Sequence, residues 1–168
     1  MIVLNAEEIK KSFNTLDDLT NSHTQGIMKI IEMNSYYCYL INLVTKINCT
    51  CINHETKQAD IGCKICLGTG HKIIINKIFC AAQETKLPTT FRSDNFIVAK
   101  NFFIPEKYKV KNNDLIVDKT GVYSVFELQR LCSLEGTIPY IKATSGKKKF
   151  DCEIFLENFE RIIGEKVW

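Results

Sequence analysis

The sequence predicts an α+β fold in which a small antiparallel β-barrel carries an N-terminal helix, a C-terminal helix and a cysteine-rich hairpin. Three observations predict it. Apolar residues recur at helical spacing near both ends of the chain, β-branched and aromatic residues fill several short segments between them, and cysteines gather between two of those segments. The 168 residues are 45% hydrophobic and 24% charged, which is typical of a folded globular protein.

One compact domain accommodates these parts. We divide it into an N-terminal helical segment (1–34), a strand hairpin with a cysteine cluster (35–80), and a β-barrel with a C-terminal helical segment (81–168). The formal net charge is +3, and the 22 basic residues are 19 Lys and 3 Arg. This composition argues against sequence-specific nucleic-acid recognition, because Arg is the usual bidentate reader of bases.

The first segment, from Asn5 to about Thr20, predicts a helix. Asn5 can cap the free N–H groups, and Glu8, three residues later, can complete a capping box. One apolar stripe follows from Ile9, Phe13, Leu16 and Leu19. A second helical piece is expected over residues 25–33, with an inward face formed by Ile27, Ile30 and Ile31.

Two strand-like segments flank the cysteine-rich stretch. Ser35 to Ile47 and His71 to Phe79 are rich in the β-branched and aromatic residues that suit a pleated surface. The stretch from Cys49 to about Gly70 lies between them. These segments predict a long hairpin whose tip is held together by the cysteines.

The second half predicts the strands of a barrel, separated by Gly- and Asp-containing turns. The expected strands are Phe96–Ile104 (ended by Pro105), Leu115–Val117, Val122–Cys132 and Ile138–Ala143. Pro139 is expected at an edge or at a strand start. A loop is expected over Ser145–Lys149. A terminal amphipathic helix from Asp151 to Ile163 follows, with an apolar face formed by Ile154, Phe155, Phe159, Ile162 and Ile163, although Phe150 to Leu156 equally suits the start of a strand.

The cysteine spacing indicates a metal site. Cys49-Thr50-Cys51 is followed, after eleven residues, by Cys63-Lys64-Ile65-Cys66 and then Leu67-Gly68-Thr69-Gly70. A tetrahedral Zn²⁺ takes four thiolate or imidazole ligands, and a Cys-x-x-Cys turn presents two sulfurs from one knuckle. We therefore expect structural zinc on Cys49, Cys51, Cys63 and Cys66, which makes this a zinc-knuckle hairpin. His54 and His71 flank the cluster as reserve ligands.

Two alternatives remain for these cysteines. They are unliganded thiols in a turn, or Cys63 and Cys66 form a redox pair, although the glycines after Cys66 would break the helix that such a pair needs. The other four cysteines lie in apolar segments and are expected to pack as small hydrophobes; they are Cys38, Cys80, Cys132 and Cys152.

No catalytic chemistry is expected. Four sulfurs close the coordination shell, whereas a catalytic zinc keeps an open position. The sequence contains neither a phosphate-binding Gly-x-x-x-x-Gly-Lys-Ser/Thr loop nor a dinucleotide-binding Gly-x-Gly-x-x-Gly motif. No signal peptide or membrane-spanning stretch is visible, so we expect the protein in the cytosol, where thiols stay reduced.

The chain resembles a family at this point. Small neck proteins of tailed bacteriophages often carry Cys-x-Cys, a polar loop and Cys-x-x-Cys-x-Gly-x-Gly ahead of a compact β-barrel. Residues 49–70 are similar to that insertion. The stretch from Asn113 through Gly121 to Val125, together with Tyr140–Ala143, looks like the barrel of a head-tail connector or stopper protein.

This resemblance implies a structural virion protein without catalysis. It would form a homo-oligomeric ring in the neck and contact a portal or adaptor protein on one side and a tail-terminator or tail-tube protein on the other. Packaged DNA would pass through the channel without sequence-specific contact, and no membrane would be involved. The ring would be assembled in the host cytoplasm and reside in the virion.

Three other functions stay open. A zinc-ribbon nucleic-acid-binding protein is the main alternative, because cysteine knuckles are frequent there, and it would show steeply salt-dependent binding. A chaperone-like zinc module of the DnaJ type uses the same Cys-x-x-Cys-x-Gly-x-Gly motif, but in repeated form. An enzyme with an unfamiliar site is the third.

Overall fold

The computed structural model describes residues 25–85, 96–133, 136–148 and 152–166. A helix covers residues 25–33, as expected, whereas the helix expected from Asn5 to Thr20 lies outside the described residues. The elements that follow are β1 (Ser35–Asn48), β2 (His71–Thr85), β3 (Phe96–Pro105), the 3-10 helix η2 (Glu106–Tyr108), β4 (Leu115–Asp118), β5 (Gly121–Ser133), β6 (Gly136–Lys148) and α2 (Cys152–Ile163).

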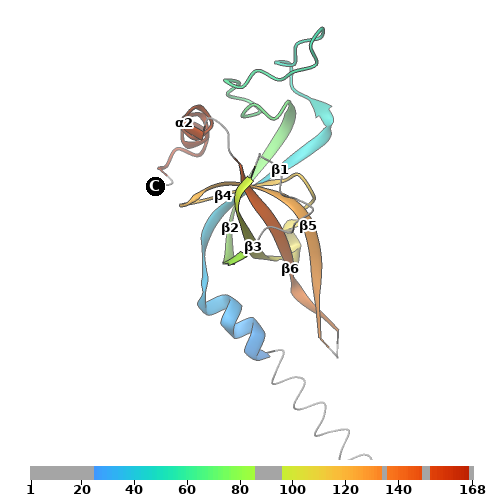
Figure 1. The fold of residues 1–168 in the computed structure, drawn as a ribbon, viewed down its shortest axis with the longest axis vertical. Coiled ribbons are helices and arrows are strands. Elements are labelled where there is room, and N and C mark those ends of the chain that lie inside the picture. Colours follow the sequence, from blue (N-terminus) through green and yellow to red (C-terminus); the bar gives the residue numbers. More distant parts are fainter. Residues whose placement is uncertain (1–24, 86–95, 134–135, 149–151, 167–168) are drawn as a thin grey trace, which may run out of the picture.

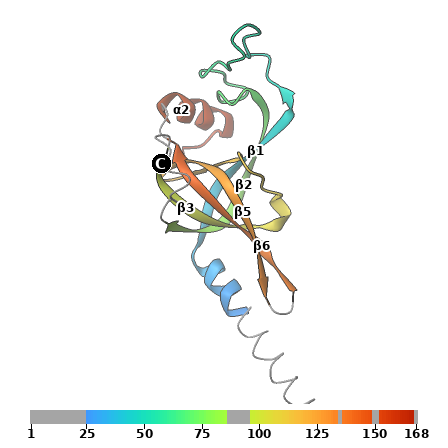
Figure 2. The ribbon, with the colours of Figure 1, turned by 45° about the vertical axis from the view of Figure 1, so that its right-hand side comes forward.

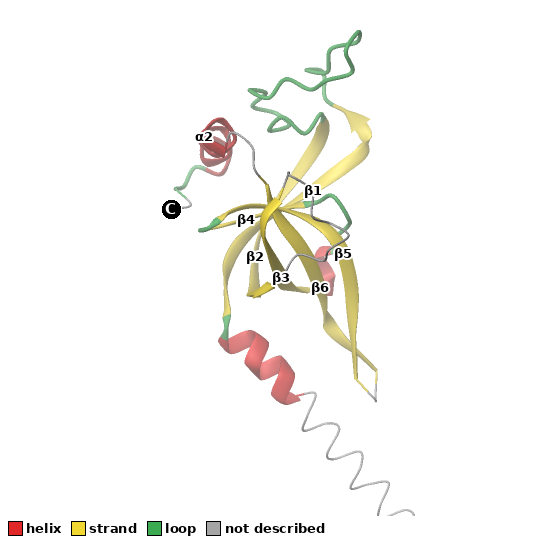
Figure 3. Cartoon of the chain, in the orientation of Figure 1, coloured by secondary structure: helices red, strands yellow, loops and turns green. Residues whose placement is uncertain are grey.

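The strands close into an antiparallel barrel. Their order around it is β1-β2-β3-β6-β5-β4, and each neighbouring pair is antiparallel. Figure 1 shows the barrel at the centre, with the β1–β2 hairpin rising from one end and the helix of residues 25–33 at the other. In Figure 3 the upper part of that hairpin ends in a long loop without regular structure. The predicted fold class is therefore confirmed.

The prediction of a loop over Ser145–Lys149 is wrong for residues 145–148, because β6 continues through them. Ser145 pairs with Val125 of β5 on one side and with Lys100 of β3 on the other, and its side chain is fully buried. Polar residues and Gly146 indicated a turn, but two neighbouring strands supply backbone partners there. Pro139 lies near the start of β6, at a register irregularity, where a missing N–H is tolerated.

The barrel interior and its outer surface at β1 and β4 are both packed. The interior core consists of Cys38, Leu40, Ile78, Cys80, Phe102, Ile104, Val110, Ile116, Tyr123, Val125 and Ala143. The second core lies under α2 and consists of Tyr39, Ile41, Leu67, Leu115, Val117, Val122, Phe155 and Phe159. The centre of β1 is therefore buried on both faces, because side chains alternate along a strand.

The two helices bury less of their predicted faces than expected. On α2, Phe155 and Phe159 are buried, and Phe159 meets Tyr39 edge-to-face at 5.3 Å between ring centroids. Ile154 and Ile162 point away and are 44% exposed each, which corrects their assignment to the apolar face. In the helix of residues 25–33, Ile31 is buried but Ile30 is 62% exposed. Within the described part of the chain, no helix is both long and apolar enough to cross a membrane.

The base of the β1–β2 hairpin is fixed by Asp114, which is almost fully buried just before β4. Its carboxylate accepts hydrogen bonds from the Leu43 N–H at 2.9 Å, the Asn42 side-chain amide at 2.9 Å and the Lys111 N–H at 2.8 Å. Asn76 of β2 donates to Asn42 in turn, at 3.0 Å. The hairpin thus leaves the barrel from an anchored position.

Candidate metal centre

The four predicted ligands lie in the loop that joins the ends of β1 and β2. Cys49 follows directly on β1, and its N–H donates to the Gly70 carbonyl at 2.8 Å, which closes the base of the loop. Cys51 comes two residues later, and Cys63 and Cys66 come from the returning half of the loop. The hairpin thereby brings two distant sequence motifs face to face.

The four sulfur atoms form one group. All lie within 4.8 Å of one another; Cys49 Sγ is 3.8 Å from Cys63 Sγ, and Cys51 Sγ is 3.4 Å from Cys66 Sγ. A tetrahedron with Zn–S bonds of about 2.3 Å has edges of about 3.8 Å. Both of these contacts join one motif to the other, and all four sulfurs share one group, which suits shared coordination better than a redox pair.

The returning half of the loop forms a tight knuckle. The Leu67 N–H donates to the Cys63 carbonyl at 2.9 Å, and the Thr69 N–H donates to the Cys66 carbonyl at 3.0 Å. Gly68 has φ +74°, and a Cβ there would lie 3.2 Å from the backbone of Ile61. This position therefore needs glycine, both for its conformation and for the close approach of the chain.

Backbone N–H groups point at the sulfurs. Burial disfavours the Cys63 thiolate, but hydrogen bonds from the N–H groups of Cys66 and Ile65 and from neighbouring thiols outweigh burial, and they lower the pKa of Cys63 to about 7. Burial raises the pKa of Cys66. Negative charge is therefore favoured at the Cys63 sulfur. A bound cation would complete the deprotonation of the other thiols.

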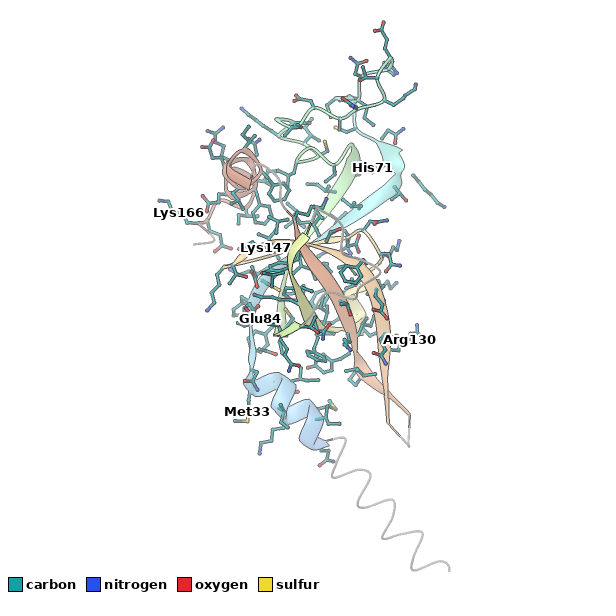
Figure 4. All side chains as sticks on the ribbon, in the orientation of Figure 1. Met33, His71, Glu84, Arg130, Lys147 and Lys166 are labelled. Carbon is teal, nitrogen blue, oxygen red and sulfur yellow. The ribbon has the colours of Figure 1, made fainter. Side chains whose placement is uncertain are left out.

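The two reserve histidines do not join the cysteine group. His54 is exposed in the loop. His71 begins β2 at the base of the loop (Figure 4), and its Nδ1 is buried without a hydrogen-bond partner. Among the described residues, the candidate ligand group therefore consists of the four cysteines. All four are soft sulfur donors, which fits zinc in a closed structural site.

The loop also packs against α2. Leu67, directly after Cys66, is only 4% exposed and belongs to the core formed with Phe155 and Phe159. The Asn158 side-chain amide donates to the Gly62 carbonyl at 3.3 Å. Figure 2 shows α2 beside the root of the hairpin in a second view. Sequence reasoning missed this contact, because nothing local to either segment specifies it.

Cys38 and Cys80 are buried in the barrel interior, in accordance with their expected role as small hydrophobes. Sequence reasoning did not foresee that their sulfurs touch, at 2.8 Å. The sequence predicted the hairpin but not its register, which sets the two residues on one face of adjacent strands. The side chains of Cys132 and Cys152 lie outside the described part of the structure.

Comparison with known proteins does not extend this description. No protein-family model matches the chain, and no curated protein matches it in sequence. The fold and the site together define a small antiparallel β-barrel protein with a four-cysteine candidate metal centre at the tip of a long hairpin.

Proposed function

We propose that Cys49, Cys51, Cys63 and Cys66 bind one structural Zn²⁺. The observation that carries this proposal is the convergence of four sulfurs within 4.8 Å of one another. The loop has little other core, because its buried apolar cluster consists of three of these cysteines with the fourth packed against them. Metal binding would supply the folding free energy that apolar burial does not.

Metal analysis of the purified protein tests this site. We expect one zinc per chain in the wild type, loss of zinc in the Cys63→Ser/Cys66→Ser double variant, and the visible absorption of a tetrahedral tetrathiolate after Co²⁺ substitution. Cys38→Ala is the matched control, because it removes a buried cysteine outside the group and should keep the zinc. A wild-type protein that folds without metal and does not take up Zn²⁺ would contradict the proposal.

We further propose that the protein is a non-catalytic structural subunit of a tailed-phage neck, assembled in the host cytoplasm and resident in the virion. The support is the similarity of residues 49–70 to the knuckle insertion of such proteins, together with a closed barrel that extends in two directions (Figures 1 and 2). The cysteine hairpin leaves one end, and the helix of residues 25–33 leaves the other.

Both extensions expose apolar side chains that a ring subunit would bury against neighbours. On the cysteine loop, Ile61 and Ile65 are 66% and 68% exposed; on the helix, Ile30 and Met33 are 62% and 76% exposed. Contacts of this kind would join copies of the chain in a ring and connect that ring to a portal or adaptor on one side and a tail-terminator or tail-tube protein on the other.

Native mass measurement tests the ring. We expect a closed homo-oligomer, alone or in the presence of a portal or tail protein. A monodisperse monomer that binds neither a portal nor a tail partner would count decisively against a role in the neck.

A zinc-ribbon nucleic-acid-binding protein is the second candidate, and one observation favours it. The cysteine hairpin exposes Lys46, Lys57, Lys64 and Lys72. Phosphate contacts by these lysines would give an affinity for DNA that falls steeply with salt concentration. Fluorescence anisotropy with labelled duplex and single-stranded DNA over a salt series distinguishes the two functions, since a neck subunit needs no such binding.

A further inference from the structure

Two cysteines outside the metal centre lie side by side inside the barrel. Cys38 on β1 and Cys80 on β2 are 1% and 0% exposed. In the antiparallel register, Cys38 pairs with Ile78 and Tyr36 pairs with Cys80, so the two cysteines are diagonal neighbours on the interior face. Their sulfurs are 2.8 Å apart.

This pair differs in geometry from the metal-site cysteines. The closest sulfur contacts there are 3.4 and 3.8 Å, and four sulfurs surround a common centre. Cys38 and Cys80 are less than 1 Å farther apart than the ~2.05 Å of a disulfide bond, and the described residues place no further metal-ligating group with them. The geometry suits a direct bond between the two sulfurs better than a shared ion.

The surroundings of Cys38 raise its pKa and so make it slow to oxidise. The Cys80 thiol contact, burial and the nearby Asp118 carboxylate all raise the pKa of Cys38. Because the thiolate is the reactive form, Cys38 stays an inert thiol in a reducing cytosol. Oxidation then depends on a small oxidant that reaches the barrel interior when the strands open locally.

We propose that Cys38 and Cys80 form a disulfide when the folded protein meets an oxidant such as hydrogen peroxide. One of the two sulfurs attacks one peroxide oxygen, the O–O bond breaks, and one water leaves, so that a sulfenic acid remains on that residue. The other sulfur then displaces the sulfenic oxygen, which leaves as a second water. The two sulfurs lose two electrons in total, and the peroxide gains them.

The bond would hold the base of the metal-binding hairpin. Residues 39–79 lie between the two cysteines and include the whole four-cysteine loop. A cross-link at this position restricts the unfolded chain and keeps β1 beside β2 irrespective of the metal. Two cross-links would therefore hold the hairpin: a metal at its tip, which requires zinc, and a disulfide at its base, which requires an oxidant.

Peptide mapping of the full-length, zinc-loaded protein tests the proposal. The protein is treated with hydrogen peroxide, remaining thiols are alkylated, and proteolytic fragments are analysed by mass spectrometry without reduction. We expect a fragment that links Cys38 to Cys80, and a rise in Tm of about 5 °C or more that a reductant reverses. Alkylation of both residues after oxidation, or a link from either to a metal-site cysteine, would overturn the proposal.

Variants separate a specific bond from general oxidation. Cys80→Ser should abolish the link and the rise in Tm, and should leave Cys38 to gain oxygen atoms, since no thiol remains to trap the sulfenic acid. Cys132→Ser is the matched control and should keep both effects. The wild-type map decides the question even where Cys80→Ser does not fold. A peroxide-induced rise in Tm that persists in a folded Cys80→Ser protein would also overturn the proposal.

Discussion

Asp118, at the end of β4, accepts hydrogen bonds from side chains of β1, of β3 and of the turn between β4 and β5. Its carboxylate accepts hydrogen bonds from the Tyr36 hydroxyl at 2.9 Å, the Lys100 ammonium at 3.0 Å and the Thr120 hydroxyl at 2.6 Å. The Lys100 and Asp118 side chains are 9% and 0% exposed. Such a pair is costly to break, because the remaining partner would keep a buried, unpaired charge.

We expect Asp118→Asn to destabilise the protein by about 3 kcal/mol at pH 7. Burial alone would raise the pKa of Asp118, but the hydrogen bonds from Thr120 and Lys100 more than offset it and lower the pKa. A carboxyl group with a lowered pKa stabilises the fold above its unfolded pKa of about 3.9, and that stability is lost as the pH falls through the folded pKa. Urea unfolding at several pH values measures both effects.

The control for this prediction is Glu165→Gln, which removes an exposed ion pair. Lys77 and Glu165 are 2.8 Å apart with side chains 46% and 47% exposed, so the expected change is about 1 kcal/mol or less. Equal losses of stability in the two variants would show that the Asp118 network contributes no more than a surface pair.

Gly68 gives a second prediction at the scale of one residue. Gly68→Ala places a Cβ at a left-handed backbone position and 3.2 Å from the Ile61 backbone, so we expect the zinc affinity to fall about tenfold or more. Gly26→Ala is the control, because a Cβ there meets nothing within 4 Å and the residue is helical. Competition with a chromogenic chelator measures the affinity; unchanged zinc binding in Gly68→Ala would contradict the prediction.

At the scale of the elements, the cysteine loop and α2 support each other. Leu67 fills the core beneath Phe155 and Phe159, and Asn158 binds the Gly62 carbonyl. We expect metal removal by a chelator to increase hydrogen exchange in α2 as well as in the loop, while peptides from β3 and β6 stay protected. Unchanged protection of α2 after complete loss of zinc would contradict this coupling.

The strands also show what a sequence can and cannot specify. The segments of β1 and β5 were predictable because β-branched and aromatic residues mark them locally, and the four ligands were predictable because their spacing is itself the signal. The extension of β6 through Ser145 depends on β3 and β5 lying on either side of it, and the contact of Cys38 with Cys80 depends on the exact register of the β1–β2 hairpin. No local pattern contains that information.

At the scale of the whole molecule, we expect the barrel to fold without the cysteine hairpin. Ile41 is the last residue of β1 that pairs with β4, and two residues farther along β1, Leu43 pairs directly with Ile73 of β2. Replacing residues 44–72 by Asn-Gly, which favours a two-residue hairpin turn, should leave a cooperatively folding barrel. We expect no zinc and a less protected α2 in this variant. Circular dichroism during thermal unfolding and metal analysis measure these outcomes; loss of the cooperative transition would show that the barrel depends on the hairpin.

The pairing of β1 with β4, which we call the seam, joins the two end strands of the sheet and so closes the barrel. It consists of the pairs Tyr39–Val117, Leu40–Ile116 and Ile41–Leu115, which join segments far apart in the sequence. The strands β5 and β6, which complete the sheet between β4 and β3, follow β4 along the chain, and β6 must pair with both β3 and β5. Phe155 and Phe159 cover the outer face of the seam. The barrel is therefore complete only after β6 has been synthesised, and α2, which follows β6 along the chain, covers the seam afterwards.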